Sequence, residues 1–208
     1  MLNINSYFST FIGQSINPNH HMIEKKIVDR CYELKKTIKR GGEGWISDQT
    51  YNTDKTYNVV DDIIFKEATD YIQKGVHSFM SQVGIDERWI RKEPYDAWFN
   101  IYEENNFQEF HNHTGCAIST VYFVRCDKTS AKIVFKNPYH DMINIPQSSK
   151  IASINMRDKV ELSGHTIKFQ PVPGMLLVFR SHVEHCVERQ RSNTERISLA
   201  YNFVKEIR

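Results

Sequence analysis

The sequence predicts a mainly β protein of the α+β class, in which a β-sandwich or squashed barrel packs against N-terminal α-helices. Three observations carry this prediction. Two amphipathic helical stripes lie before residue 94, seven or eight short segments of strand composition follow residue 95, and the last of these segments alternates between polar and apolar residues. A run of helices followed by a run of strands is typical of an α+β domain.

The first predicted helix follows Asn17-Pro18, which provides a capping residue and a first-turn proline. Its apolar residues recur at steps of three or four and form one stripe, namely Ile23, Ile27, Cys31, Leu34 and Ile38. Gly41-Gly42 ends the helix after a basic last turn. His20 and His21 lie at its start, and we expect both to be solvated.

The second predicted helix begins at Asp61-Asp62 and ends at Gly84. Its stripe consists of Ile64, Ala68, Tyr71, Ile72, Val76, Phe79 and Val83. The segment between the helices is polar and predicts a loop. Part of it, Ser47–Asn58, and a later segment, Tyr139–Asp158, are candidate lids over a binding site.

From Tyr95 onward, β-branched and aromatic residues alternate with Gly, Pro, Asn and Asp clusters, a pattern that predicts strands. The candidate strands are Ala97–Glu103, Ala117–Arg125, Lys132–Lys136, Thr166–Gln170, Met175–Arg180, His182–Arg189 and Arg196–Lys205. Residues 175–179 are wholly apolar, which predicts a strand that is buried on both faces.

The last candidate strand has two distinct faces. One face carries Arg196, Ser198, Ala200 and Asn202, and the other carries Ile197, Leu199, Tyr201 and Phe203. We expect the N-terminal helices to cover the apolar face. The polar face, with small groups around one arginine, is typical of a pocket lining.

The length of 208 residues is that of a single domain. We therefore expect one domain over 1–208, with a helical support region over 1–94 and a β core over 95–208. The 27 basic and 25 acidic residues are interspersed and give a net charge of +2, which provides no concentrated basic face for nucleic acid.

No apolar run reaches the roughly 18 residues that span a bilayer, and the N-terminus lacks the pattern of a signal peptide. We therefore expect a soluble, cytoplasmic protein without a membrane partner. Its four cysteines form no Cys-x-x-Cys pair, which favours reduced, structural thiols.

Three histidines are the candidate metal ligands. His111 and His113 are separated by one residue, so on a strand both point to the same side. Neutral imidazoles are common ligands of divalent metals. We expect the chain to return through a hairpin near 190–194 that places Ser198 opposite His185. Arg196 then offers a bidentate fork for a carboxylate near the metal.

The segment from Trp98 to Phe203 resembles the core of the iron(II)- and 2-oxoglutarate-dependent oxygenases, in particular a group of 2OG-Fe(II) oxygenases found in bacteria and tailed phages. The matching stretches are Asn100-x-Tyr102, His111-x-His113, Ser119-Thr120-Val121-Tyr122-Phe123, Pro173-Gly174-x-Leu176-Leu177-Val178-Phe179, Ser181-x-x-x-His185 and Arg196-Ile197-Ser198. The resemblance covers about half of the chain. It implies a double-stranded β-helix (jelly roll).

The resemblance also implies a non-haem iron dioxygenase with Fe(2+) and 2-oxoglutarate as cofactors. His111 and His185 would bind the iron. Arg196 and Ser198 would bind the distal carboxylate of 2-oxoglutarate, with Tyr102 a weaker candidate at the same site. The enzyme would use O2, release succinate and CO2, and hydroxylate a substrate, either an amino-acid residue, as in prolyl hydroxylases, or a small molecule.

One residue departs from the superfamily pattern, since His113 stands where a ligand carboxylate is usual. We predict a three-histidine site. Two alternatives stay open at this point: a water or halide in place of His113, or a carboxylate from Glu109 or Asp127. Arg180 also stands where the resembled block commonly has proline.

Two other functions fit some of these residues. A cupin-like dioxygenase would use three histidines without 2-oxoglutarate, and Arg196→Ala distinguishes it because only a 2-oxoglutarate enzyme would lose co-substrate affinity. A non-enzymatic jelly-roll binding module would hold no stoichiometric metal.

Overall fold

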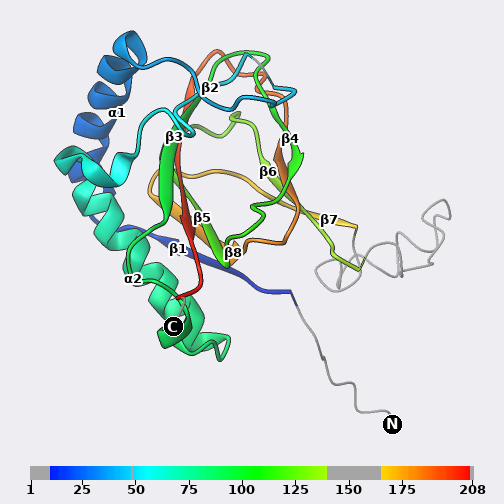
Figure 1. Cartoon of the computed structure of the whole chain (residues 1–208). Helices are drawn as coiled ribbons and strands as arrows, with labels where there is room; N and C mark the ends of the chain where they lie inside the picture. The colour runs from blue at the N-terminus through cyan, green and yellow to red at the C-terminus, as the bar shows by residue number, and fades with distance from the viewer. Residues whose placement is uncertain (1–9, 48, 140–164, 207–208) are drawn as a thin grey trace, which may run out of the picture.

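Two antiparallel β-sheets and two α-helices form three layers in the computed structural model, which describes residues 10–47, 49–139 and 165–206 (Figure 1). The helices α1 (His20–Thr37) and α2 (Lys66–Gln82) cover one face of the larger sheet. The smaller sheet lies on the opposite side of that sheet. The predicted class, mainly β with N-terminal helices, is confirmed.

The larger sheet has six strands in the order β1-β8-β5-β10-β3-β2. Their bounds are β1 (Ile12–Ile16), β8 (Met175–Arg180), β5 (Ile118–Arg125), β10 (Arg196–Phe203), β3 (Asp96–Tyr102) and β2 (Tyr51–Asn52). The smaller sheet has the order β4-β9-β6-β7. Its bounds are β4 (Gln108–His111), β9 (His185–Val187), β6 (Ile133–Lys136) and β7 (Thr166–Phe169).

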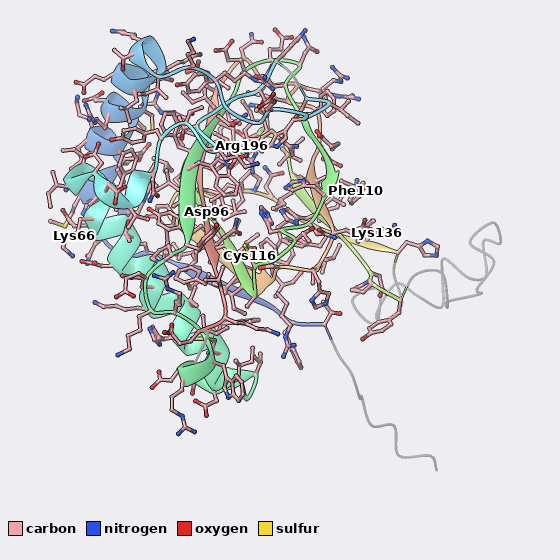
Figure 2. All side chains as sticks on the ribbon, in the orientation of Figure 1. Lys66, Asp96, Phe110, Cys116, Lys136 and Arg196 are labelled. Atoms are coloured by element: carbon pink, nitrogen blue, oxygen red, sulfur yellow. The ribbon has the colours of Figure 1, made fainter. Side chains whose placement is uncertain are left out.

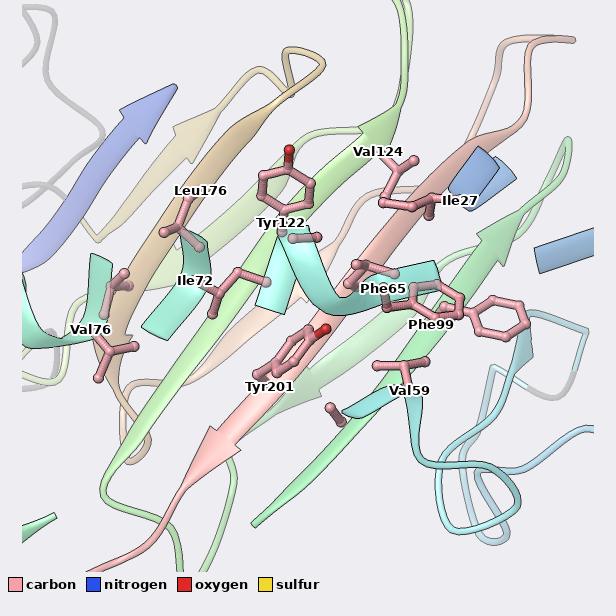
Figure 3. Close-up of a cluster of buried hydrophobic side chains, with 14 of the residues drawn as sticks. Ile27, Val59, Phe65, Ile72, Val76, Phe99, Tyr122, Val124, Leu176 and Tyr201 are labelled. Atoms are coloured by element: carbon pink, nitrogen blue, oxygen red, sulfur yellow. The ribbon is translucent and has the colours of Figure 1, made fainter. Parts of the chain in front are cut away.

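The main core lies between the helices and the larger sheet. The stripe residues Ile27 and Ile72 are fully buried there, in one apolar cluster with Tyr201 and Phe99 (Figure 3). A second apolar cluster includes Phe123 from the larger sheet and Phe135 from the smaller one. Both faces of the larger sheet are therefore covered, as predicted for residues 175–179.

Helix α2 begins later than the expected Asp61-Asp62. Two 3₁₀ turns, η1 (Val59–Asp61) and η2 (Ile63–Phe65), precede it. The Asp62 backbone is extended, and its side chain accepts the N–H of Ile64. An aspartate that caps the following turn in this way interrupts the helix, so the regular helix starts only at Lys66.

His20 is buried, and the expectation that it is solvated was wrong. Its Nε2 donates to the Val124 carbonyl at 2.9 Å, and its Nδ1 accepts from the Tyr122 hydroxyl at 2.8 Å. Burial lowers the pKa of His20. This histidine therefore ties the start of α1 to β5.

The N-terminal region is not wholly helical, because β1 and β2 add strands to both edges of the larger sheet. Two strands in the core also differ from expectation. The strand β4, which ends at His111, was not predicted, and β9 is shorter than the expected His182–Arg189. A third short 3₁₀ turn, η3 (Glu87–Trp89), precedes β3.

The predicted hairpin between His185 and Arg196 is also wrong. The strand β9 pairs with β4 and β6, whereas β10 pairs with β3 and β5. The chain therefore crosses from the smaller sheet to the larger one between them. His185 and Ser198 approach each other because the two sheets face each other and not because their strands pair.

Among the described residues, neither α-helix combines the length and the hydropathy needed to cross a bilayer. One candidate lid, Tyr139–Asp158, lies outside the described residues except for Tyr139.

Candidate metal centre

Three histidine side chains converge between the two sheets. His111 ends β4 and pairs in register with His185, the first residue of β9. His113 follows β4, and its backbone N–H donates to the Ser181 carbonyl at 3.0 Å. One ring nitrogen from each histidine lies within 4.8 Å of the other two. A single ion can contact three nitrogens at this spacing.

Two of these rings have a defined proton position. The Nδ1 of His111 bonds the Glu109 carbonyl at 2.8 Å, and the Nδ1 of His185 bonds the Val183 carbonyl at 3.0 Å. A carbonyl only accepts, so each Nδ1 carries the proton and each Nε2 keeps its lone pair. Both rings are thus oriented as metal ligands commonly are.

His113 completes the cluster from a different direction. Its Nε2 lies 3.3 Å from the Nε2 of His185. Two nitrogens bound to one ion at about 2.0–2.1 Å are separated by about 2.9–3.4 Å at octahedral or tetrahedral angles. The other nitrogen of His113 contacts the side-chain amide of Asn202 at 3.2 Å.

All three imidazoles are neutral near pH 7. Burial, together with the neighbouring His111, lowers the pKa of His113 to about 3. Burial lowers the pKa of His111, and it lowers that of His185 well below its ordinary value. Neutral imidazole is the form that binds a metal ion, so the donor set fits a divalent metal.

Arg196 provides a positive charge deep in the same region. Its side chain is 1% exposed, and its guanidinium lies 4.6 Å from the Tyr102 ring and 4.9 Å from the Phe123 ring. Its Nε and Nη1 have no hydrogen-bond partner among the described residues. A buried charge without an anionic partner is costly, so these N–H groups fit an anionic ligand. Ser198, also buried, lies on the same face of β10.

One cavity connects the histidines with the arginine. Its lining includes His111, His113, His185, Tyr102, Arg196 and Ser198. Figure 2 shows Arg196 in the interior, between β3 and the smaller sheet. Trp98 Nε1 and Asn100 Oδ1 also line the cavity and lack hydrogen-bond partners among the described residues. The cavity therefore offers a metal-binding end, an anion-binding end and free polar groups.

Trp45 also lines this cavity, and sequence reasoning did not single it out. Its ring stacks on His111 with 6.4 Å between centroids. The Glu109 carboxylate accepts the N–H groups of Ile46 at 2.8 Å and Ser47 at 3.3 Å, which fixes the segment. In the sequence, Trp45 lies in a segment that is recognisable only as polar. That pattern does not show that the Trp45 ring contacts His111.

The carboxylates considered as alternative ligands are engaged elsewhere. Glu109 holds the segment around Trp45, and Asp127 accepts the N–H of Thr129 within its own turn at 2.7 Å. Neither belongs to the histidine cluster. Arg180, the other unusual residue, is exposed at the end of β8.

A model of the family described as "Putative 2OG-Fe(II) oxygenase" matches residues 96–202, which is half of the chain. The match begins at β3 and ends within β10, so it contains every candidate ligand named above. No protein of curated function matches the chain by sequence.

Several solved structures share the fold. A prolyl-4-hydroxylase from Pseudomonas putida gives a TM-score of 0.62 at 12% identity, over 96% of this chain and 95% of that one. A second structure is a prolyl hydroxylase from Trichoplax adhaerens, in complex with a peptide fragment of the hypoxia inducible factor oxygen degradation domain. Its TM-score is 0.57 at 14% sequence identity, over 92% of this chain and 83% of that one. HygX from Streptomyces hygroscopicus, with nickel and 2-oxoglutarate bound, gives a TM-score of 0.57 at 8% sequence identity, over 94% of this chain and 83% of that one. The fold is thus the double-stranded β-helix.

Proposed function

The chain belongs to the 2OG-Fe(II) oxygenase family, and we propose that it hydroxylates its substrate at a three-histidine iron site between the two sheets. It is an enzyme, a 2-oxoglutarate-dependent Fe(II) oxygenase, with Fe(II) and 2-oxoglutarate as its cofactors. This assignment decides against the cupin-like enzyme without 2-oxoglutarate and against the non-enzymatic module. In the proposed site, His111, His113 and His185 hold the iron.

The observation that carries the proposal is the cavity that contains both the histidine cluster and the unpartnered N–H groups of Arg196. 2-Oxoglutarate has a carboxylate at each end, so one end can reach the metal while the distal end meets a guanidinium. We assign the distal carboxylate to Arg196 and Ser198. Tyr102, which stacks on Arg196, orients the guanidinium.

When bound, iron and 2-oxoglutarate supply the oxidising chemistry, in which O2 and 2-oxoglutarate yield succinate, CO2 and a hydroxylated carbon. One oxygen atom enters succinate and the other replaces the hydrogen of a substrate C–H bond with a hydroxyl. The residues of the chain bind and orient these reactants. The apolar part of the cavity lining, formed by Val121, Ile133 and Val187, limits the water around the reacting atoms.

For the substrate, we propose an amino-acid residue in the manner of prolyl hydroxylases, with a small molecule as the second candidate. Two structures that share the fold are prolyl hydroxylases, and one of them holds a peptide. A carbocyclase with the same fold, SnoK from nogalamycin biosynthesis, supports the second candidate.

The proposal is tested by titrating Fe(II) and 2-oxoglutarate into the metal-free protein without O2. We expect the visible metal-to-ligand charge-transfer band of the complex and, after O2 is admitted, stoichiometric succinate. His111→Ala and His185→Ala should abolish both signals. An absent band together with absent succinate in the wild type would refute the proposal. Incubation with peptide and metabolite mixtures, read by a mass increase of one oxygen, then identifies the substrate class.

A further inference from the structure

A chain of buried polar side chains leads from His113 into the larger sheet. The Ser181 and Ser119 hydroxyls are 2.7 Å apart, and the Ser119 hydroxyl donates to Asn202 Oδ1 at 2.7 Å. The amide nitrogen of Asn202 then lies 3.2 Å from His113 Nδ1. All three polar residues beyond the histidine are at most 3% exposed. A buried polar chain is costly unless every member is satisfied, and this one is.

The direction of these hydrogen bonds determines the tautomer of His113. With the amide nitrogen donating to Nδ1, the neutral ring carries its proton on Nε2. That Nε2 lies 3.3 Å from the Nε2 of His185, which keeps a lone pair and can accept the proton. In this direction the chain of hydrogen bonds provides a partner for each polar group of the metal-free site. The Nε2 of His113 carries a proton, however, and has no lone pair with which to bind a metal.

The same chain of hydrogen bonds can run in the opposite direction. The oxygen and nitrogen of a side-chain amide are nearly equal in size, and hydroxyl groups rotate freely. A half-turn of the Asn202 amide would let His113 Nδ1–H donate to the amide oxygen. It would also change the hydrogen bond between the Asn202 side chain and the Asp96 carboxyl, whose pKa is raised by burial, so this carboxyl would have to carry a proton or move away from the amide oxygen. The amide nitrogen would donate to Ser119, and Ser119 to Ser181. His113 Nε2 would then be free to bind a metal.

We propose that Asn202 is the positioning residue for the third metal ligand, because the direction of its amide decides which nitrogen of His113 carries the proton. The inference rests on the proposed function, since it takes the histidine cluster as the iron site. His111 and His185 are held by backbone carbonyls, which only accept. Only His113 is held by a group that can either donate or accept.

The primary test is NMR of the protein labelled with ¹⁵N-histidine, read by two-bond ¹H–¹⁵N correlations, without metal and with diamagnetic Zn(II). We expect His113 to be protonated on Nε2 without metal and on Nδ1 with Zn(II). His111 and His185 should be protonated on Nδ1 in both states. An unchanged His113 tautomer would overturn the inference.

The second test measures Zn(II) affinity calorimetrically. Asn202→Ala should weaken binding by about 10–100-fold, the usual cost of losing a group that orients a ligand. In a His113→Ala background the same change should have no further effect. An equal loss in both backgrounds would mean a general structural effect and would overturn the inference. Tyr201→Phe, on the opposite face of β10, removes a hydrogen bond to Thr69 and is the control, with unchanged Zn(II) affinity.

A conservative rescue is available from the cross-strand partner of Asn202, which is Asp96. The double variant Asp96→Asn/Asn202→Asp keeps the charge of the pair and puts an acceptor-only group beside His113. We expect protonation on Nδ1 already without metal and an affinity at least equal to that of the wild type. An Nε2 proton in this variant would overturn the inference.

The two proposals fail differently. A wild-type protein that neither binds metal nor forms succinate contradicts the proposed function. A protein that forms succinate, but whose His113 tautomer is the same with and without metal, contradicts only the role of Asn202.

Discussion

At the scale of single residues, Arg196 shows how burial creates a binding group. The guanidinium lies against two aromatic rings and is removed from water, while two of its nitrogens, Nε and Nη1, lack hydrogen-bond partners among the described residues. Burial lowers the pKa of Arg196, although a guanidinium keeps its charge at neutral pH. The fold therefore contains a buried charge that is unfavourable in the free protein and that an anionic ligand would stabilise.

Arg196→Met tests this interpretation, because methionine keeps much of the packing and removes the charge. Without ligand, we expect the variant to be more stable than the wild type by about 1–4 kcal/mol, the range for buried ion pairs that are replaced by apolar residues, because the change removes the desolvation cost of a buried charge. 2-Oxoglutarate with a divalent metal should raise the unfolding midpoint of the wild type and leave that of the variant at its metal-only value.

The control for this prediction is Arg180→Met, which changes an exposed arginine on β8. It should alter neither the stability nor the response to 2-oxoglutarate. If Arg196→Met still responds to 2-oxoglutarate like the wild type, the assignment of the carboxylate site is wrong.

At the scale of elements, β4 connects the metal site with the segment around Trp45. The Glu109 backbone carbonyl orients His111, while its side chain holds the N–H groups of Ile46 and Ser47. Burial opposes the ionisation of Glu109, but the hydrogen bonds that it accepts outweigh this effect and lower its pKa. The segment should stay docked above the ordinary pKa of a glutamate and detach as pH falls through the lowered value.

Glu109→Gln should loosen the segment at neutral pH. The amide retains one acceptor oxygen and turns its NH2 group toward the other backbone N–H. A hydrogen bond to a charged acceptor contributes about 1.5–3 kcal/mol, so amide exchange at Ile46 and Ser47 should accelerate about 10-fold or more. Hydrogen exchange followed by NMR measures this, with the exposed Glu103→Gln as control. Unchanged protection in Glu109→Gln would contradict the role given to this carboxylate.

At the scale of the whole molecule, the site lies where two sheets face each other and the helices shield the far side of one of them (Figure 1). This arrangement buries His185, half-buries His111 and His113, and keeps all three neutral, with the pKa of His113 at about 3. In the unfolded chain the same histidines titrate near their ordinary pKa. Below that value the unfolded state takes up protons that the folded state does not.

The stability of the metal-free protein should therefore fall as pH decreases below about 6.5, the ordinary pKa of histidine, and keep falling toward the lowered values of the folded state. His113, whose pKa in the folded protein is about 3, contributes about 1.4 kcal/mol of this loss between pH 8 and pH 5.5. His113→Leu should reduce the pH dependence by that amount in urea unfolding with a chelator present. Coincident pH profiles of variant and wild type would contradict the desolvated, neutral state of this residue.

The sequence by itself determined the class of the fold and the candidate residues. Apolar residues at steps of three or four predicted both helices. The alternation in β10 assigned Tyr201 to the core and Arg196 to a pocket, and the structure places both residues there. These features are local, since periodicity places side chains on a face whatever the remaining chain does. Helix boundaries at Asp62 were less well predicted, because a side-chain cap competes with the helix.

Only the tertiary structure decided how the site is assembled. The approach of His185 and Arg196 depends on two sheets facing each other, a relation that strand spacing does not encode and that was expected as a hairpin. Trp45 reaches His111 through contacts across the fold, from a loop whose composition indicates only polarity. The tautomer of His113 depends on Asn202, far along the chain. Local sequence sets the face of each side chain, whereas the packing of sheets sets its partners.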